Sequence, residues 1–237
     1  MMRWEYKDTL YVEGKKREFT TRTVGDMRDV LFSKVDLEDD TVLYYMFRNV
    51  APEPDAQIFK KHNIRYDITV MLPIELGLEF NKTYGHYHPL VNKKSYPEIY
   101  EVLQGKAYYL LQRKIDENVD RAILVVAEKG DKVLIPPNYG HVTINPTKET
   151  LIMANLVFDG FKSEYGDYRE KGGACYYITT DKQYIPNKRY GDVPTLEVSN
   201  ANFNKEGTIY SLFLANPKDF EFLKKPELCK QSDVFES

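Results

Sequence analysis

The chain has 237 residues, enough to bury a sizeable core as one large domain or two small ones. Its net charge of −3 at pH 7 is spread along the sequence, which argues against nucleic-acid binding. No hydrophobic run approaches a membrane span, no signal peptide is evident, and Cys175 and Cys229 lack CxxC spacing. We therefore expect a cytoplasmic protein with reduced thiols that has no nucleic-acid or membrane partner.

The N-terminal part, residues 1–64, carries mixed patterns that predict short elements packed on a larger unit. The clearest early strand is at residues 10–12. Residues 23–33 place apolar side chains at helical spacing, which predicts an amphipathic helix. A strand is expected over residues 42–48, and residues 52–62 favour a short helix or a loop.

The central part, residues 65–180, carries closely spaced strands with turn residues between them. The segments are rich in β-branched and aromatic side chains, and they are separated by Gly, Asp, Asn and Pro. Short strands at such intervals are typical of an all-β barrel. The expected strands are residues 65–72, 83–88, 98–103, 106–112, 121–126, 132–135, 141–145, 150–157 and 176–180.

The C-terminal part, residues 181–237, is expected to form a strap and a tail. Pro186, Gly191 and Pro194 predict an irregular strap over the barrel as far as residue 198. Beyond residue 200, we expect one further hairpin at residues 208–214 and a short helix at residues 217–224.

Three of the four histidines fall in two short segments with a glutamate between them. Residues two apart on a strand share a face, so His86 and His88 can contact one ion from a single strand. Glu98 can reach the ion from the next hairpin, and His141 from a more distant strand. This ligand set suits Fe(II), Mn(II), Ni(II) or Zn(II) and differs from a thiolate-rich structural zinc site. The sequence therefore predicts one divalent transition ion per chain.

The residues around these ligands resemble the two sequence motifs of the cupin family. The shared positions are Glu98, Gly105, Gly130, Pro136, His141 and Asn145. Asn138 stands where the second motif usually has glycine, but asparagine tolerates a positive φ, so the turn should form. The resemblance implies a jelly-roll barrel of the double-stranded β-helix type, dominated by β-structure, with a few short flanking helices.

Within the cupins, the chain resembles the glucose-6-phosphate isomerases of archaea and some bacteria. The runs that carry this resemblance are TYGHYH at 83–88, PEIY at 97–100 and LIPPNYGH at 134–141. The resemblance implies interconversion of glucose 6-phosphate and fructose 6-phosphate in glycolysis and gluconeogenesis. It also implies a cytoplasmic homodimer and favours iron among the candidate metals.

The same resemblance suggests residues that bind a sugar phosphate. Tyr44 and Tyr165 match tyrosines that line the family's pocket. The hydroxyls of Thr69 and Thr83 can donate hydrogen bonds to a phosphate, and Gly85 allows close approach to its amide because it has no Cβ.

The expected catalytic residues are Glu98, His141 and Tyr100. Tyr100 shares the strand face of Glu98, so we also expect it to contact the substrate. Glu98 can act as a general base through an enediol, or the metal can promote a direct hydride shift, and the sequence leaves both routes open. Some family members have a histidine shortly before the Glu164-Tyr165-Gly166 run. This chain has Lys162-Ser163 there, so a ring-opening role for such a histidine does not carry over.

Two other functions fit the metal ligands. A cupin dioxygenase also uses three histidines and a glutamate to bind Fe(II) for O₂ chemistry. A metal-loaded sugar-binding cupin without catalysis is the alternative outside enzymes. The set of Thr69, Thr83 and Gly85 favours the isomerase over the dioxygenase, because dioxygenase substrates seldom need a phosphate site.

Overall fold

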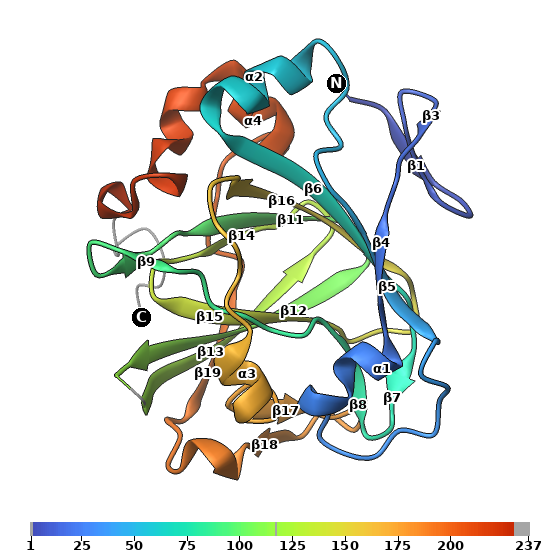
Figure 1. The fold of residues 1–237 in the computed structure, drawn as a ribbon, viewed down its shortest axis with the longest axis vertical. Coiled ribbons are helices and arrows are strands. Elements are labelled where there is room, and N and C mark those ends of the chain that lie inside the picture. The colour runs from blue at the N-terminus through green and yellow to red at the C-terminus, as the bar shows by residue number, and fades with distance from the viewer. Residues whose placement is uncertain (1, 117, 230–237) are drawn as a thin grey trace.

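A computed structural model describes residues 2–116 and 118–229, and two six-stranded sheets form its barrel (Figure 1). The first sheet has the order β14 (Lys132–Ile135), β11 (Glu98–Gln104), β16 (Leu151–Phe158), β6 (Ile64–Met71), β5 (Val42–Phe47) and β4 (Thr20–Thr23). The second has the order β19 (Leu196–Asn200), β13 (Asn118–Glu128), β12 (Lys106–Ile115), β15 (Tyr139–Asn145), β8 (Glu79–Lys82) and β7 (Glu75–Leu76).

Neighbouring strands within these two sheets are antiparallel except β13 and β19, which run parallel. This arrangement confirms the predicted jelly roll dominated by β-structure. Strands β4, β5 and β19 show that residues outside 65–180 also build the barrel walls.

Smaller elements surround the barrel. The short strands are β1 (Trp4–Tyr6), β2 (Leu10–Val12), β3 (Lys15–Lys16), β9 (Leu90–Val91), β10 (Lys94–Ser95), β17 (Tyr176–Ile178) and β18 (Tyr184–Pro186). The α-helices are α1 (Val24–Met27), α2 (Asp55–His62), α3 (Gly166–Glu170) and α4 (Ile209–Ala215). The 3-10 helices are η1 (Arg28–Val30), η2 (Lys188–Tyr190), η3 (Pro217–Leu223) and η4 (Pro226–Leu228). None of the helices described here is long and apolar enough to cross a membrane.

The first sheet is buried on both faces, because alternate residues along its strands pack into two different cores. On β16 and β6, Met153 and Met71 point into the barrel and join its inner core. Their neighbours Ile152 and Val70 point outward and join a second core. Helices α2, α4 and η3 cover this outer face, so β6 and β16 are buried along almost their whole length (Figure 1).

The predicted hairpin at residues 208–214 is wrong, because this segment forms helix α4. Thr208 caps the helix by accepting a hydrogen bond from the Ser211 amide, and the Ser211 side chain bonds back to the Thr208 amide. The buried residues Ile209, Tyr210 and Phe213 lie at helical spacing and face the second core. The expected helix at residues 217–224 is present as η3, and the strap ends in β19, which the sequence pattern did not predict.

Candidate metal centre

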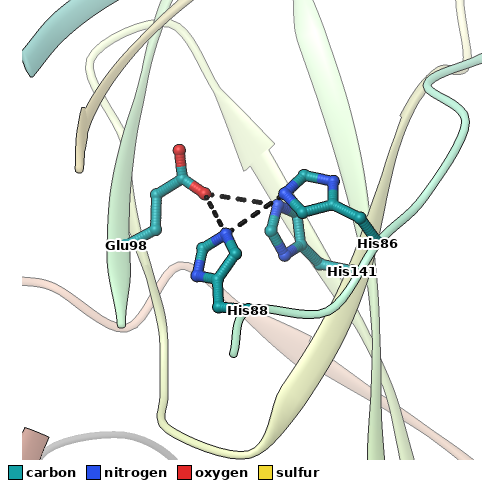
Figure 2. A group of neighbouring side chains, drawn as sticks. All are labelled: His86, His88, Glu98 and His141. Carbon is teal, nitrogen blue, oxygen red and sulfur yellow. Dashed lines mark hydrogen bonds and ion pairs between the residues drawn. The ribbon is translucent and has the colours of Figure 1, made fainter. Parts of the chain in front are cut away.

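Four side chains converge inside the barrel, where Figure 2 shows their polar atoms facing one another. They are His86 and His88 after β8, Glu98 at the start of β11 and His141 on β15. One ligand atom from each lies within 4.8 Å of all the others. The Glu98 Oε2 atom is 3.4 Å from the Nε2 atoms of both His88 and His141, and the Nε2 atoms of His86 and His88 are 3.1 Å apart. One ion can therefore contact all four residues.

The local structure that presents the histidines is not the regular strand predicted over residues 83–88. Strand β8 ends at Lys82, and the following segment makes isolated bridges in place of a continuous strand. His86 pairs with His141, and Tyr87 pairs with Glu164; each pair exchanges two backbone hydrogen bonds. Gly85 has a φ of +84°, and a Cβ there would lie 2.4 Å from the Tyr168 ring. Glycine is required because the turn and the packing both exclude a side chain.

Two neighbouring groups fix the orientation of the ligands. The Nδ1 atom of His88 lies 2.7 Å from the carbonyl oxygen of Tyr96, so Nδ1 carries the proton and Nε2 presents a lone pair to the centre. Asn155 donates a hydrogen bond of 2.7 Å to the Oε1 atom of Glu98. His88 and Glu98 are thereby each held by the protein at one atom and face the centre with the other, whereas the Nδ1 atom of His141 is buried without a hydrogen-bond partner among the described residues.

Burial sets the electrostatics of the four ligands. It lowers the pKa of His88 to about 4 and holds the pKa values of His86 and His141 well below the usual range for histidine. Burial also raises the pKa of Glu98 to about 8, although the charges of Arg65 and Arg48 act in the opposite direction. Neutral imidazoles and a buried carboxylate together form a donor set that a divalent transition ion fits.

The ligands open onto a cavity of about 80 Å³ that is accessible from solvent. We call this space the ligand cavity. His86, His88 and Glu98 line it, and the structure brings all the expected substrate residues to the same walls. These are Tyr44, Thr69, Thr83, Gly85, Tyr100 and Tyr165.

Several of these residues are already held in place by backbone or ring contacts. The Thr83 hydroxyl accepts a hydrogen bond of 2.9 Å from the amide of Thr143, so its own proton remains available to a ligand. The Tyr44 hydroxyl accepts from the amide of Tyr84 at 3.3 Å. The Tyr165 ring lies 5.4 Å from the ring of His86, between centroids. The Tyr100 hydroxyl lies 3.1 Å from Nε2 of His141 and so reaches the centre itself.

The sequence interpretation missed five polar residues of the ligand cavity, namely Arg22, Arg48, Arg65, Asn155 and Ser163. Strand register explains two of these positions. Arg22 lies opposite Tyr44, and Asn155 lies opposite Tyr100, so each pair shares the inward face. No sequence signal singled out the arginines: Arg22 lies in the polar strand β4, and alternation alone does not show which strand face becomes the interior.

Comparison with known proteins gives a consistent result. The family model of glucose-6-phosphate isomerase (GPI) matches residues 22–195. A glucose-6-phosphate isomerase of Thermococcus gammatolerans is 30% identical over 170 residues, covering 70% of this chain and 82% of that protein. One from Pyrococcus abyssi is 28% identical over 182 residues, covering 70% of this chain and 88% of that protein.

Among solved structures, two oxalate decarboxylases resemble part of the chain. The Bacillus subtilis enzyme is 19% identical with a TM-score of 0.36, covering 51% of this chain and 27% of that one. The Lactobacillus farciminis enzyme is 21% identical with a TM-score of 0.38, covering 51% of this chain and 30% of that one. These scores are too low to carry an argument, and the fold follows here from the strand pairing. By the family match over most of its length, the chain belongs to the glucose-6-phosphate isomerase family.

Proposed function

We propose that the protein is a metal-dependent isomerase that interconverts glucose 6-phosphate and fructose 6-phosphate. The observation that carries this proposal is the ligand cavity itself. It joins a centre of three histidines and one glutamate to a set of hydroxyl, amide and guanidinium donors suited to a phosphate. Membership of the isomerase family supports the same reaction.

The phosphate is proposed to bind beside Arg22. The Nε atom of Arg22 is buried, and none of the described residues accepts a hydrogen bond from it. The guanidinium lies 5.7 Å from the ring centroid of Tyr84 and 5.9 Å from that of Tyr165. Because an arginine binds phosphate oxygens through two parallel hydrogen bonds, it complements the hydroxyls of Thr69 and Thr83 at this end of the cavity.

The metal ion is proposed to be held by His86, His88, Glu98 and His141, with Fe(II) favoured and Mn(II), Ni(II) or Zn(II) as alternatives. When bound, such an ion supplies Lewis acidity toward a carbonyl or hydroxyl oxygen. If His141 holds the ion through Nε2, that nitrogen can no longer accept a hydrogen bond from the Tyr100 hydroxyl. Within the described part of the chain, the remaining hydrogen-bond partner of Tyr100 is then the carboxyl group of Glu98.

The isomerisation moves one hydrogen between C2 and C1 of the open-chain sugar. By the enediol route, a base takes the C2 proton, the C–H electron pair forms the C1–C2 double bond, and O1 takes up a proton as the C1 carbonyl bond opens. O2 then loses its proton and becomes the C2 carbonyl oxygen, while a proton is delivered to C1. By the hydride route, hydrogen moves from C2 to C1 with its electron pair, O2 loses its proton and O1 gains one. Glu98 is the carboxylate among the four candidate ligands. Its Oε1 atom accepts a hydrogen bond from Asn155 and its Oε2 atom faces the metal centre, so Glu98 is poorly placed to act as a free base. Reaction in D₂O separates the routes, since the enediol route places deuterium in the product.

Three further features are proposed on the strength of family membership. The enzyme would act in the cytoplasm, assemble as a homodimer and serve glycolysis and gluconeogenesis.

Turnover of purified, metal-loaded protein tests the proposed function. Formation of fructose 6-phosphate is followed in a coupled assay, with free glucose as the matched substrate that lacks the phosphate. We expect turnover of glucose 6-phosphate and at least a ten-fold higher KM for glucose, because hydrogen bonds to a charged group are worth about 1.5–3 kcal/mol. Oxygen consumption without isomerisation would instead indicate the dioxygenase, and binding without turnover would indicate the non-catalytic sugar-binding protein.

A further inference from the structure

A second group of charges lies in the ligand cavity, away from the proposed phosphate end. Arg48 and Arg65 both line the cavity, and both bind the same carboxylate, that of Asp67. The Asp67 Oδ2 atom is 2.6 Å from Nη1 of Arg48 and 2.6 Å from Nε of Arg65. The Asp67 side chain is only 1% exposed, and its other oxygen accepts a hydrogen bond from the amide of Asn49. The buried carboxylate therefore fixes two guanidinium groups.

Strand register connects this group to the metal centre. On neighbouring strands, Asp67 of β6 lies opposite Asn155 of β16, which in turn lies opposite Tyr100 of β11. Asn155 binds Glu98, and Tyr100 contacts His141. The charged group and the metal ligands thus occupy one continuous wall of the ligand cavity.

The two arginines of the group differ in how they use their donors. Arg65 uses its Nε atom for Asp67 and its Nη1 atom for Asp159, at 2.6 and 3.0 Å. Arg48 uses Nη1 for Asp67, while its Nη2 atom contacts only the Met46 sulfur, a weak acceptor at 3.5 Å. The Arg48 side chain is 45% exposed at the cavity wall. Arg48 is the more exposed arginine of the pair, at 45% against 23% for Arg65, so it is the one placed to offer donors to an incoming anion.

Arg48 also lies well away from Arg22. Arg22 pairs with Tyr44, and Tyr44 precedes Arg48 by four residues along the same chain segment, a rise of roughly 13 Å for an extended strand. Long side chains reach inward from both positions. The ligand cavity therefore has a cationic group at each end, with the metal ligands along its wall, and an open-chain sugar phosphate fits between them.

We infer that Arg48 is a specificity-determining residue that binds the end of the ligand opposite the phosphate, while Asp67 and Arg65 position it. Because the inference rests on the proposed function, that end is C1 and C2 of the sugar. Arg48 donates hydrogen bonds to oxygens there that carry negative charge. The ligand class that this arrangement selects is a sugar phosphate with an anionic oxygen at its far end, such as an aldonic acid phosphate.

A comparison of two ligands on two variants tests this role. Binding of 6-phosphogluconate, which carries a carboxylate at C1, and of glucitol 6-phosphate, which carries a neutral hydroxyl there, is measured by calorimetry on metal-loaded protein. Arg48→Met should lower the affinity for 6-phosphogluconate ten- to hundred-fold, which is the range for hydrogen bonds between charged groups. It should lower the affinity for glucitol 6-phosphate less than about three-fold. Arg48→Lys, which keeps the charge and a donor for Asp67, should give an intermediate loss. Arg3→Met, at a residue whose side chain is 87% exposed, is the matched control and should change neither affinity.

The outcomes separate this inference from the proposed function. Equal losses for both ligands in Arg48→Met, or no loss for either, would overturn the role of Arg48. Selective loss of the acid supports that role even in protein that shows no isomerase turnover, in which case the proposed function alone fails. Arg48→Lys keeps the inference testable if removing the guanidinium from Asp67 prevents folding of the methionine variant.

Discussion

Two of the four candidate metal ligands, His88 and Glu98, are held by the protein at one atom and face the centre with another. His88 uses Nδ1 on the Tyr96 carbonyl oxygen, and Glu98 uses Oε1 on the Asn155 amide. The two free atoms, Nε2 and Oε2, lie 3.4 Å apart and face the same point. Such outer contacts orient ligands before the ion arrives, so the geometry does not have to be created by binding.

Removing the outer contact of Glu98 should weaken metal binding. Asn155→Leu preserves the approximate size of the side chain but leaves the buried Oε1 atom without its donor. We expect metal affinity to fall by about 10- to 100-fold, measured by titration against a competing chelator. Asn200→Leu, at an exposed position of β19, is the control. Unchanged affinity in Asn155→Leu would mean that the ligand needs no such support.

Thr83 is expected to act on the substrate rather than on the metal. Thr83→Val removes the hydroxyl that faces the proposed phosphate, so KM for glucose 6-phosphate should rise about ten-fold with metal content unchanged. It also leaves the Thr143 amide without its acceptor, so Tm should fall. Thr83→Ser retains the oxygen and should restore both values. A valine variant with the parental KM would remove Thr83 from the phosphate site.

The metal ligands could be found from the sequence, whereas the arginines could not. His86, His88, Glu98 and His141 stand in a recognisable spacing, and the structure brings them together. Arg48 and Arg65 carry no such signal. Alternation shows that residues share a face, but it does not show which face becomes the interior when strands far apart in sequence pair.

At the scale of elements, the C-terminal segment supports the barrel from outside. Helices α4 and η3 cover the outer face of the first sheet, and the amide of Ile209 donates to the buried carboxylate of Glu101 at 2.7 Å. The hairpin prediction failed here because a short apolar run fits the alternation of a strand and the periodicity of a helix almost equally well. The choice between strand and helix depends on packing against the apolar outer face of the first sheet, and the local sequence does not contain this information.

This segment should matter for stability and not for catalysis. Phe213 is fully buried, stacks on Phe59 at 4.6 Å between centroids and lines no part of the ligand cavity. Phe213→Ala should lower the free energy of unfolding by about 3–5 kcal/mol, measured by urea denaturation, with kcat and metal affinity retained. Leu228→Ala, at a side chain that is 53% exposed, should cost far less. A stable but inactive Phe213→Ala protein would show that the segment controls the active site.

At the scale of the whole molecule, stability of the metal-free protein should depend on pH through the buried ligands. Burial raises the pKa of Glu98 from 4.5 to about 8, so the folded chain keeps a proton that the unfolded chain releases. Between about pH 6.5 and 8, stability should therefore fall as pH rises, by at most about 1.4 kcal/mol per pH unit. Below pH 6.5, the lowered histidine pKa values act the other way, because the unfolded chain binds protons that the folded chain excludes.

Denaturant unfolding of metal-free protein across this range checks the prediction. The glutamine in Glu98→Gln cannot titrate. The variant should therefore lose the fall in stability as pH rises above 6.5, and it should keep the fall in stability as pH drops below 6.5. An identical profile in the two proteins above pH 6.5 would show that Glu98 is not the group responsible.

The whole-molecule account depends on one ion acting at the four ligands. The most direct measurement is isomerase activity as a function of metal bound per chain, starting from chelator-treated protein and adding back a divalent transition metal. Activity should be absent without metal and rise in proportion to occupancy, with a break at one ion per chain and recovery of the initial rate. Full turnover of glucose 6-phosphate by the metal-free protein in the presence of chelator would contradict the account.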